Sequence, residues 1–536
     1  MPPIPPDQAT FQRLLQIVLA LSGERNITRL YEQIIEAAQD LTHAEGGALY
    51  IAQEHEGRPI LQFEVVRNDA LGLRLGGTSG QPVALPGIPL IFPDGRPNYG
   101  NVCAFVYHHG HPLNIKDSYA IEGFDFSRAQ ALDEQSGYHS QSLLVLPLIN
   151  HAGDVIGVLK LINAKSADTG ETIPFAPWLE PIAAALASSA AITLDNQKLL
   201  QAHRDLLDAF VKAIAQAIDA KSTHTSGHCQ RVPVLTELLA QAACRAQEGP
   251  LKDFNLDEND WYELHVAAWL HDCGKLSTPD SLLDKSTKLH ALCDRIESVK
   301  VRFAALISQT RLCYADNPDP AARQALEARI TELREDCAFL ERANTGSEFM
   351  CPDDQARVRR IAALTWQDHL GVEQPLLSEE EADMLCISRG TLSGAERERI
   401  NDHINVTIQM LEGLPFPKHL ARVPEYAGGH HEKINGTGYP RGLHREQMSW
   451  PARMMAIADV FEALTAGDRP YKPPMKLSQA LSILKNMATN GHIDPDLYDL
   501  FIAERVWDTY ARSHLLPEQM DVIDSNPYRL PAHALL

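Results

Sequence analysis

The chain has 536 residues, 44% of them hydrophobic, and its 48 Lys and Arg against 70 Asp and Glu give a formal net charge of −22. One hydrophobic core rarely serves a chain of this length, so we expect two or three domains. Such an acidic surface repels nucleic acid polymers and anionic membranes, which excludes both as partners. A phosphate ligand would therefore need a local basic or metal-rich pocket.

Cysteine usage and the start of the chain bear on the cellular compartment. The nine cysteines are odd in number and none lies in a CxxC motif, a pattern that favours a reducing environment over a disulfide framework. The first residues, MPPIPPDQATF, lack the basic and apolar regions of a signal peptide. No apolar run reaches membrane-spanning length. We therefore expect a cytoplasmic protein.

The N-terminal region predicts an α+β sensor-like domain over residues 11–195, after a Pro-rich, disordered start over residues 1–10. Apolar spacing is helical from Phe11 to about Asp40. Alternation and β-branched or aromatic residues then predict five strands, in GGALYIAQ, ILQFEVVRND, AFVYHH, SLLVLPLI and VIGVLKLINA. The last two are joined by a turn over residues 150–154. Helix, antiparallel strands and helix make one compact domain.

A long stretch over residues 178–220 is nearly free of Gly and Pro and predicts one amphipathic helix. Its apolar positions recur at intervals of three and four residues, namely Leu194, Leu199, Leu206, Phe210, Ile214 and Ile218. This spacing favours a signalling helix that pairs with its copy in a parallel homodimer. The alternative is a helix that packs only against its own domains.

The C-terminal half predicts an all-α domain over residues 205–512 and a tail over residues 513–536. Runs such as ELHVAAWLHDCGK and PARMMAIADVFEALTAG have helical spacing, and no segment has the pattern of a sheet. Five of its segments offer metal-ligating side chains, at His228, His271 with Asp272, His403, His430 with His431, and Asp459. Imidazoles within apolar helical patterns need partners, and a metal ion is one. For any one of them the alternative is a satisfied core histidine.

The order of these residues resembles the HD-GYP subgroup of HD phosphohydrolases. His271-Asp272 gives the HD motif, Gly438-Tyr439-Pro440 the GYP motif, and residues 469–472 the arginine-proline-tyrosine element. The resemblance covers residues 205–510 apart from one insertion. It implies a helical domain with two or three metal ions that hydrolyses cyclic di-GMP or a related cyclic dinucleotide.

The resemblance also implies individual roles. The metal ligands would be His228, His271, Asp272, His403, His430, His431 and Asp459, with Asp272 bridging two ions. Histidine with carboxylate suits iron or manganese, with zinc as the alternative. Lys275, one turn after His271, would hold a phosphate oxygen. Arg469 and Lys472 would hold the other phosphate, unless they form surface ion pairs, and His224 would add a ligand for a third ion, unless it points to water.

Residues 114–163 resemble GAF domains attached to cyclic-nucleotide enzymes, and the likeness extends over residues 12–195. It implies an enclosed small-molecule pocket. Five residues match the signature of cyclic-nucleotide-binding members, with a departure in spacing: Asn114, Lys116, Phe126, Asp133 and Glu134. The alternative is a dimerisation domain without a pocket.

The chain departs from the HD-GYP pattern in the 132 positions between His271 and His403. Residues 286–392 form the extra segment, which predicts a peripheral helical hairpin joined around NPDP. Asn435 also stands where the family usually has Asp. His108, His109 and His111 are expected to be exposed loop histidines, because no full ligand set accompanies them.

Two other functions compete with the cyclic-dinucleotide phosphodiesterase. One is a metal phosphohydrolase acting on another nucleotide or phosphate ester, since HD sites are chemically general. The other is a non-catalytic receptor for the dinucleotide.

Overall fold

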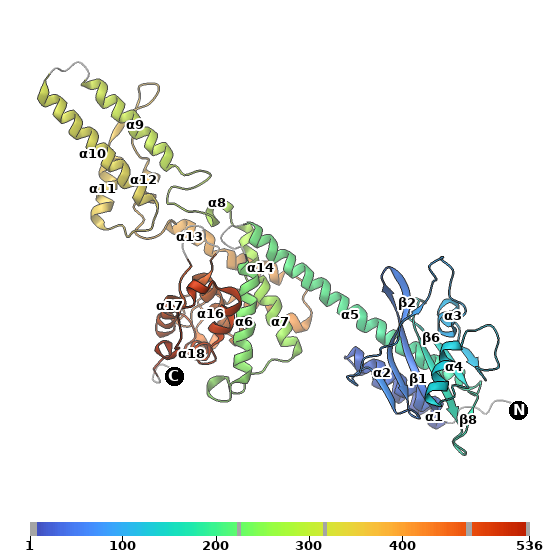
Figure 1. Ribbon diagram of the computed structural model, residues 1–536. Coiled ribbons are helices and arrows are strands. Elements are labelled where there is room, and N and C mark those ends of the chain that lie inside the picture. The colour runs from blue at the N-terminus through green and yellow to red at the C-terminus, as the bar shows by residue number, and fades with distance from the viewer. Residues whose placement is uncertain (1–7, 222–226, 315–318, 468–473, 532–536) are drawn as a thin grey trace. The chain divides into compact units, whose positions relative to one another are not determined.

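The computed structural model describes residues 8–221, 227–314, 319–467 and 474–531, and the chain forms two compact units, residues 1–206 and 207–536. Figure 1 shows the helices and strands of both units. None of the helices in the described ranges combines the length and apolar character that a membrane span requires.

The N-terminal unit contains one antiparallel sheet in the order β3-β2-β1-β7-β6-β5, with β4 paired to β2 and β8 paired to β7. The strands are β1 (Ala44–His55), β2 (Arg58–Asn68), β3 (Leu73–Gly76), β4 (Ile88–Pro89), β5 (Leu113–Ile115), β6 (Leu143–Ile149), β7 (Val155–Lys165) and β8 (Thr172–Ile173). The helices are α1 (Gln8–Gly23), α2 (Ile27–Thr42), α3 (Val102–His109), α4 (Ser127–Ser136) and the first part of α5 (Leu179–Lys221).

Alternation along the central strands separates two hydrophobic cores. Leu49 of β1 and Leu159 of β7 are register partners and face the core built with α2 and α5. Tyr50 and Val158, also partners, face the opposite core beside α3. The predicted α+β domain is therefore confirmed.

One predicted strand is wrong: AFVYHH lies in helix α3. The side chain of Asn101 caps this helix by accepting hydrogen bonds from the amides of Cys103 and Ala104, at 2.9 and 3.3 Å. Asn before a short apolar run is a helix start signal, and a run this short has no decisive periodicity. His108 and His109 therefore lie on a helix rather than in a loop, and each contacts a backbone carbonyl.

The predicted helix over residues 11–40 is two helices. Asn26 separates them and caps α2 by accepting a hydrogen bond from the amide of Arg29 at 3.0 Å. Residues 8–10, predicted to be disordered, begin α1, and residues 1–7 lie outside the described range.

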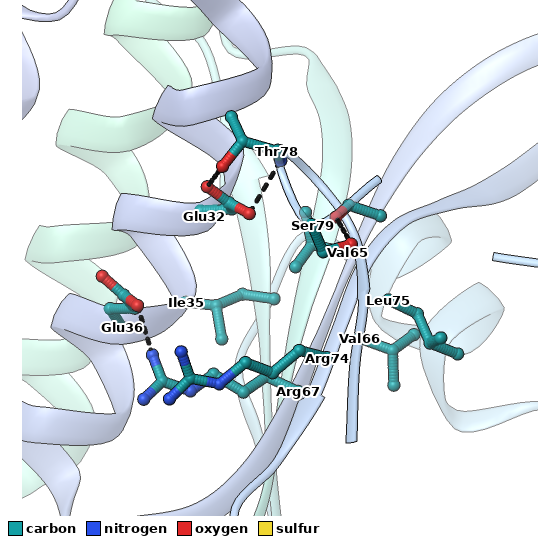
Figure 2. Close-up of a pocket in the computed structure, with 11 residues that line it drawn as sticks. Glu32, Ile35, Glu36, Val65, Val66, Arg67, Arg74, Leu75, Thr78 and Ser79 are labelled. Atoms are coloured by element: carbon teal, nitrogen blue, oxygen red, sulfur yellow. Dashed lines mark hydrogen bonds and ion pairs between the residues drawn. The ribbon is translucent and has the colours of Figure 1, made fainter. Parts of the chain in front are cut away.

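A pocket of about 220 Å³ lies between α2 and the β2–β3 hairpin (Figure 2). Glu32 accepts hydrogen bonds there from the amide and hydroxyl of Thr78, at 2.7 and 2.6 Å. Glu36 pairs with Arg67 at 2.5 Å. These bonds fasten the hairpin to the helix, which gives the pocket's acidic side chains a structural role.

The long predicted helix is present as α5, but its apolar residues do not form one face. Leu194 is buried in the N-terminal unit and Ile218 in the C-terminal unit, whereas Leu199, Leu206 and Phe210 are exposed. A different row, spaced alternately by four and three residues, is exposed throughout: Ile192, Asn196, Leu199, His203, Leu206, Phe210, Ala213 and Ala217. This is the heptad spacing of a coiled-coil seam.

The C-terminal unit is helical around its largest core. Its helices are the last part of α5, α6 (His228–Arg245), α7 (Glu258–Leu270), α8 (Asp280–Leu283), α13 (Gly394–Asn401), α14 (His403–Glu412), α15 (Val423–Gly428), α16 (Trp450–Thr465), α17 (Leu477–Thr489), α18 (Pro495–Ala503) and α19 (Val506–His514). Residues from α6, α16, α17, α18 and α19 share that core. The predicted tail packs on it too, since Leu530 is buried and the Tyr498 hydroxyl donates to the carbonyl of Tyr528 at 2.7 Å.

The insertion has its own hydrophobic core, built from residues 289–387. Helices α9 (Ile296–Cys313) and α10 (Pro320–Asn344) pack together, as the predicted hairpin requires; part of NPDP lies outside the described residues. Helices α11 (Pro352–Ala362) and α12 (Glu379–Leu385) and a two-stranded sheet, β9 (Thr365–Gln367) with β10 (Glu373–Pro375), complete it. Neither this sheet nor the compact form was predicted.

The two ends of the insertion meet at a narrow base. Lys285 pairs with Glu396 at 2.6 Å, and the hydroxyl of Thr391 donates to the carbonyl of Lys285 at 3.3 Å. A short linker therefore suffices to join the flanking residues.

Replacing residues 286–392 with a short Gly-Ser linker should leave the remaining helical domain folded and its metal content unchanged, because the insertion core is separate and contains no predicted ligand. Circular dichroism and elemental analysis of the purified variant measure both. A folded variant without metal would show that the insertion helps to build the site.

Candidate metal centre

The predicted ligands come from five segments, most of them at helix ends. His228 begins α6, His271 and Asp272 follow the last residue of α7, and His403 begins α14. His430 and His431 follow α15, and Asp459 lies within α16. Three overlapping groups among these seven side chains bring their ligand atoms within 4.8 Å of one another. The fold thus brings all seven predicted ligands into one site.

Backbone contacts orient three of the imidazoles. Nδ1 of His271, His403 and His430 lies 2.7, 2.5 and 2.6 Å from the backbone carbonyl oxygen three residues earlier. A carbonyl oxygen only accepts hydrogen bonds, so each Nδ1 carries the proton. In the neutral ring Nε2 is then the atom left to bind a metal ion, which is the usual arrangement for histidine ligands.

The carboxylate of Asp272 lies at the centre of these rings. One oxygen is 3.3 Å from Nε2 of His403, and the other is 3.2 Å from Nε2 of His271 and 3.4 Å from Nε2 of His228. The side chain is 1% exposed. Burial would raise the pKa of Asp272, but the ammonium of Lys275 and the contacts with His271 and His228 keep it well below its ordinary value. A buried anion in this position requires cations around it.

Several of these atoms have no hydrogen-bond partner among the described residues. Nε2 of His271, His403 and His430, and one oxygen of Asp272, are buried and unsatisfied. Lone pairs that face one another at this range repel unless a cation lies between them. Burial lowers the pKa of His430 well below its ordinary value and that of His431 to about 4, so both rings are neutral and available as ligands. The donor set therefore fits divalent metal ions.

Glu462, which sequence reasoning missed, holds His228. Its carboxylate contacts Nδ1 of His228 and accepts a hydrogen bond from Nε of Arg231 at 2.7 Å. The His228 ring then directs Nε2 toward Asp272 and toward Asp459, 3.2 Å away. A signal was present, because Glu462 lies three residues after Asp459 and so on the same face of α16.

Close backbone contacts position the HD turn. The amide of Gly274 donates to the hydroxyl of Thr407 at 2.9 Å. A Cβ atom at position 274 would lie 1.9 Å from the carbonyl oxygen of His403. Only glycine lets this turn approach α14 so closely, which brings Asp272 to His403.

The GYP loop folds around a buried carboxylate. Glu432 accepts hydrogen bonds from the amides of Arg441 and Leu443, at 2.7 and 2.9 Å. A Cβ atom at Gly438 would lie 2.3 Å from the amide nitrogen of Lys433, so this position too requires glycine. The ring of Tyr439 packs against that of His431, with centroids 4.9 Å apart.

Lys275 reaches the site by a different local geometry from the one predicted. The HD pair lies at the end of α7, not within a helix, and Lys275 lies in the following 3-10 turn, Cys273–Ser277. Its ammonium is 2.6 Å from Asp272. His224, Arg469 and Lys472 lie outside the described residues.

A cavity of about 400 Å³ lies in the N-terminal unit between the sheet and α4. Of the five signature residues, Phe126 and Asp133 line it. Asp133 accepts hydrogen bonds from the Tyr119 hydroxyl at 2.7 Å and from the amide and hydroxyl of Ser140 at 2.7 and 2.9 Å. Lys116 and Glu134 are exposed and are not among the lining residues. The structure therefore contains a pocket, but three of the five signature residues, Asn114, Lys116 and Glu134, are not among the residues that line it.

Comparison with known proteins agrees with this architecture. Residues 26–194 match the GAF domain model and residues 380–497 match an HD domain model. A 3'3'-cGAMP-specific phosphodiesterase of Vibrio cholerae is 27% identical over 302 residues, which are 56% of this chain and 40% of the relative. A cyclic di-GMP phosphodiesterase of Pseudomonas aeruginosa is 49% identical over 227 residues, which are 39% of this chain and 52% of the relative.

The chain therefore carries a GAF domain followed by a region that matches an HD domain, and the Gly438-Tyr439-Pro440 motif lies within that match. It spans about half or less of the length of these two relatives. The HD domain match begins at residue 380, inside the insertion, and therefore leaves out His271 and Asp272. The fold nevertheless brings these two residues next to His430, which lies within the match.

Glu462→Gln should weaken metal binding by roughly 10- to 100-fold, because the neutral amide orients His228 and polarises its ring less well than a carboxylate. Competition with a chelator measures the affinity. Glu504→Gln, at an exposed carboxylate of the same unit, is the matched control. Equal affinity in the two variants would contradict a supporting role for Glu462.

Proposed function

We propose that the protein is a metal-dependent phosphodiesterase that hydrolyses a cyclic dinucleotide, cyclic di-GMP in the first place, to a linear dinucleotide or mononucleotides. The observation that carries the proposal is the set of buried, oriented Nε2 atoms around Asp272. The two relatives are named as phosphodiesterases of 3'3'-cGAMP and of cyclic di-GMP, which supports a cyclic dinucleotide as the substrate.

The proposed metal ligands are the seven side chains of the site: His228, His271, Asp272, His403, His430, His431 and Asp459. Asp272 would bridge two ions; its two oxygens face different histidines, which supports this role. We propose two tightly held ions per chain, iron or manganese by the chemistry of the donors. Such ions lower the pKa of a coordinated water and neutralise phosphate oxygens.

Positively charged side chains of the protein would add to the metal ions in neutralising the phosphates of an anionic substrate. Burial would lower the pKa of Lys275, but Asp272 and Asp459 raise it well above its ordinary value, so the ammonium stays charged. A flexible ammonium beside the metal site is suited to a phosphate oxygen. Arg469 and Lys472 stay proposed contacts for the other phosphate, and His224 a proposed contact for a third ion.

The double variant His271→Ala, Asp272→Ala should lose both hydrolysis and bound metal while its helix content stays near that of the wild type, because the two side chains lie at the centre of the ligand set. Elemental analysis of anaerobically purified protein, circular dichroism and chromatography of cyclic di-GMP products give the three readouts. Full activity in this variant would show that the assigned site is wrong.

The same product assay separates the competing functions. Linear dinucleotide or mononucleotide is expected. Cyclic di-GMP that stays intact while another phosphate ester is cleaved would indicate a different phosphohydrolase. Saturable binding with no cleavage by metal-replete protein would indicate a receptor.

We propose that the GAF domain regulates this activity through a small molecule in its cavity, and that α5 mediates a parallel homodimer. The cavity of about 400 Å³ is large enough for a small ligand. On α5 the exposed heptad row is apolar at Ile192, Leu199, Leu206 and Phe210. Asn196, between them, would favour a parallel dimer in register.

The double variant Leu199→Glu, Leu206→Glu should convert the dimer into a monomer, because paired carboxylates would then face one another across the seam. Multi-angle light scattering at micromolar concentration measures the mass. Gln201→Glu, exposed on the same helix but off the heptad row, should leave the dimer intact. A wild-type protein that is already monomeric would end the dimer proposal.

A further inference from the structure

A cavity of about 250 Å³ adjoins the metal centre on the side of the GYP loop. It is lined by two of the proposed metal ligands and by residues of three further segments, namely His430, His431, Glu432, Lys433, Tyr439, Ala456, Val460, His492 and Ile493.

The walls of this cavity have the character of a base-binding pocket. Ala456, Val460 and Ile493 supply apolar surface, and Tyr439 and His492 supply rings. Flat aromatic ligands bind such surfaces, with a few polar groups fixing their orientation.

The two charged side chains of the cavity, Glu432 and Lys433, differ in their partners. Both oxygens of Glu432 are already occupied by backbone amides of the GYP loop. The ammonium of Lys433 has no hydrogen-bond or ion-pair partner within the described ranges. Burial lowers the pKa of His492, and the nearby positive charge of Lys433 lowers it further.

The two segments that carry Lys433 and His492 are fastened together. The amide of Asn435 donates to the carbonyl of Gly491 at 3.1 Å, and its side-chain amide donates to the carbonyl of Asn490 at 3.2 Å. The amide of His492 donates to the carbonyl of Met487 at 2.8 Å. The cavity is therefore formed before a ligand enters.

We propose that this cavity holds a guanine base of the substrate and that Lys433 selects guanine by donating hydrogen bonds to its O6 and N7. The inference rests on the proposed cyclic-dinucleotide hydrolysis and names the determinant of its base preference. A lysine ammonium pairs with the two acceptors on that edge of guanine. Adenine keeps N7 but carries an amino group in place of O6, so the ammonium would lose one of its two acceptors and would face a donor at that position.

Lys433→Met tests the proposal, since it removes the ammonium but keeps an unbranched side chain. Hydrolysis of cyclic di-GMP, of cyclic di-AMP and of bis(4-nitrophenyl) phosphate, which has no base, is measured on metal-replete protein. We expect kcat/KM for cyclic di-GMP to fall roughly tenfold or more, with a smaller change for cyclic di-AMP. The base-free ester and the metal content should be unaffected. Lys418→Met, at an exposed lysine of the same unit, is the control.

Calorimetric binding of both dinucleotides provides a readout that does not depend on turnover. Unchanged guanine preference in Lys433→Met, in hydrolysis and in binding, overturns the proposal. An equal loss on the base-free ester also overturns it, because Lys433 would then serve the phosphate or the fold. A wild type that binds but cleaves no cyclic dinucleotide, and whose guanine preference disappears in Lys433→Met, would refute the proposed function and support the base pocket.

Discussion

The buried carboxylate of Asp272 is the constraint on which the C-terminal unit depends. An anion that is 1% exposed and surrounded by imidazole rings cannot remain in a protein core without compensating positive charge. The carbonyl groups behind His271, His403 and His430 hold a proton on Nδ1, so Nε2 of each neutral ring can bind a cation. Lys275 supplies one charge. The remaining lone pairs are arranged for metal ions, and this arrangement distinguishes the site from a set of satisfied core histidines.

Helix ends deliver most of these ligands, and the reason is geometric. A residue just before or after a helix has a backbone that is free to turn, so its side chain can be aimed at a point that several helices share. Glycine then allows the segments to approach: Gly274 against α14 and Gly438 against the start of the GYP loop. The motif glycines thus have a packing role, while the carboxylate of Glu432 closes the loop that forms one wall of the adjacent cavity.

The insertion and α5 show how the site is kept apart from the rest of the chain. The insertion packs its apolar residues into its own core and joins the rest of the C-terminal unit through a base that Lys285 and Glu396 hold together. The first part of helix α5 packs into the core of the N-terminal unit, and its last part packs into a core of the C-terminal unit. The heptad row on this helix stays exposed. Regulation by the GAF domain would therefore act through this helix, whose pairing with a second copy is part of the proposal.

The sequence alone determined the domain order, the strands with strong alternation, the long helix, and the identity of the seven residues that meet at the site. Those predictions rest on local periodicity and on a motif order that few folds share. It failed where local signals are weak or misleading: the short AFVYHH run forms a helix, and the apolar residues of α5 belong to different faces. Only the tertiary structure decided that Glu462 supports His228, that Lys275 reaches Asp272 from a 3-10 turn, and that Lys433 and His492 line one cavity. The contact of Glu462 with His228 and the shared cavity of Lys433 and His492 join segments distant in sequence, and packing and backbone hydrogen bonds set their approach. The 3-10 turn that carries Lys275 follows from the close approach of Gly274 to α14, which the local sequence does not encode.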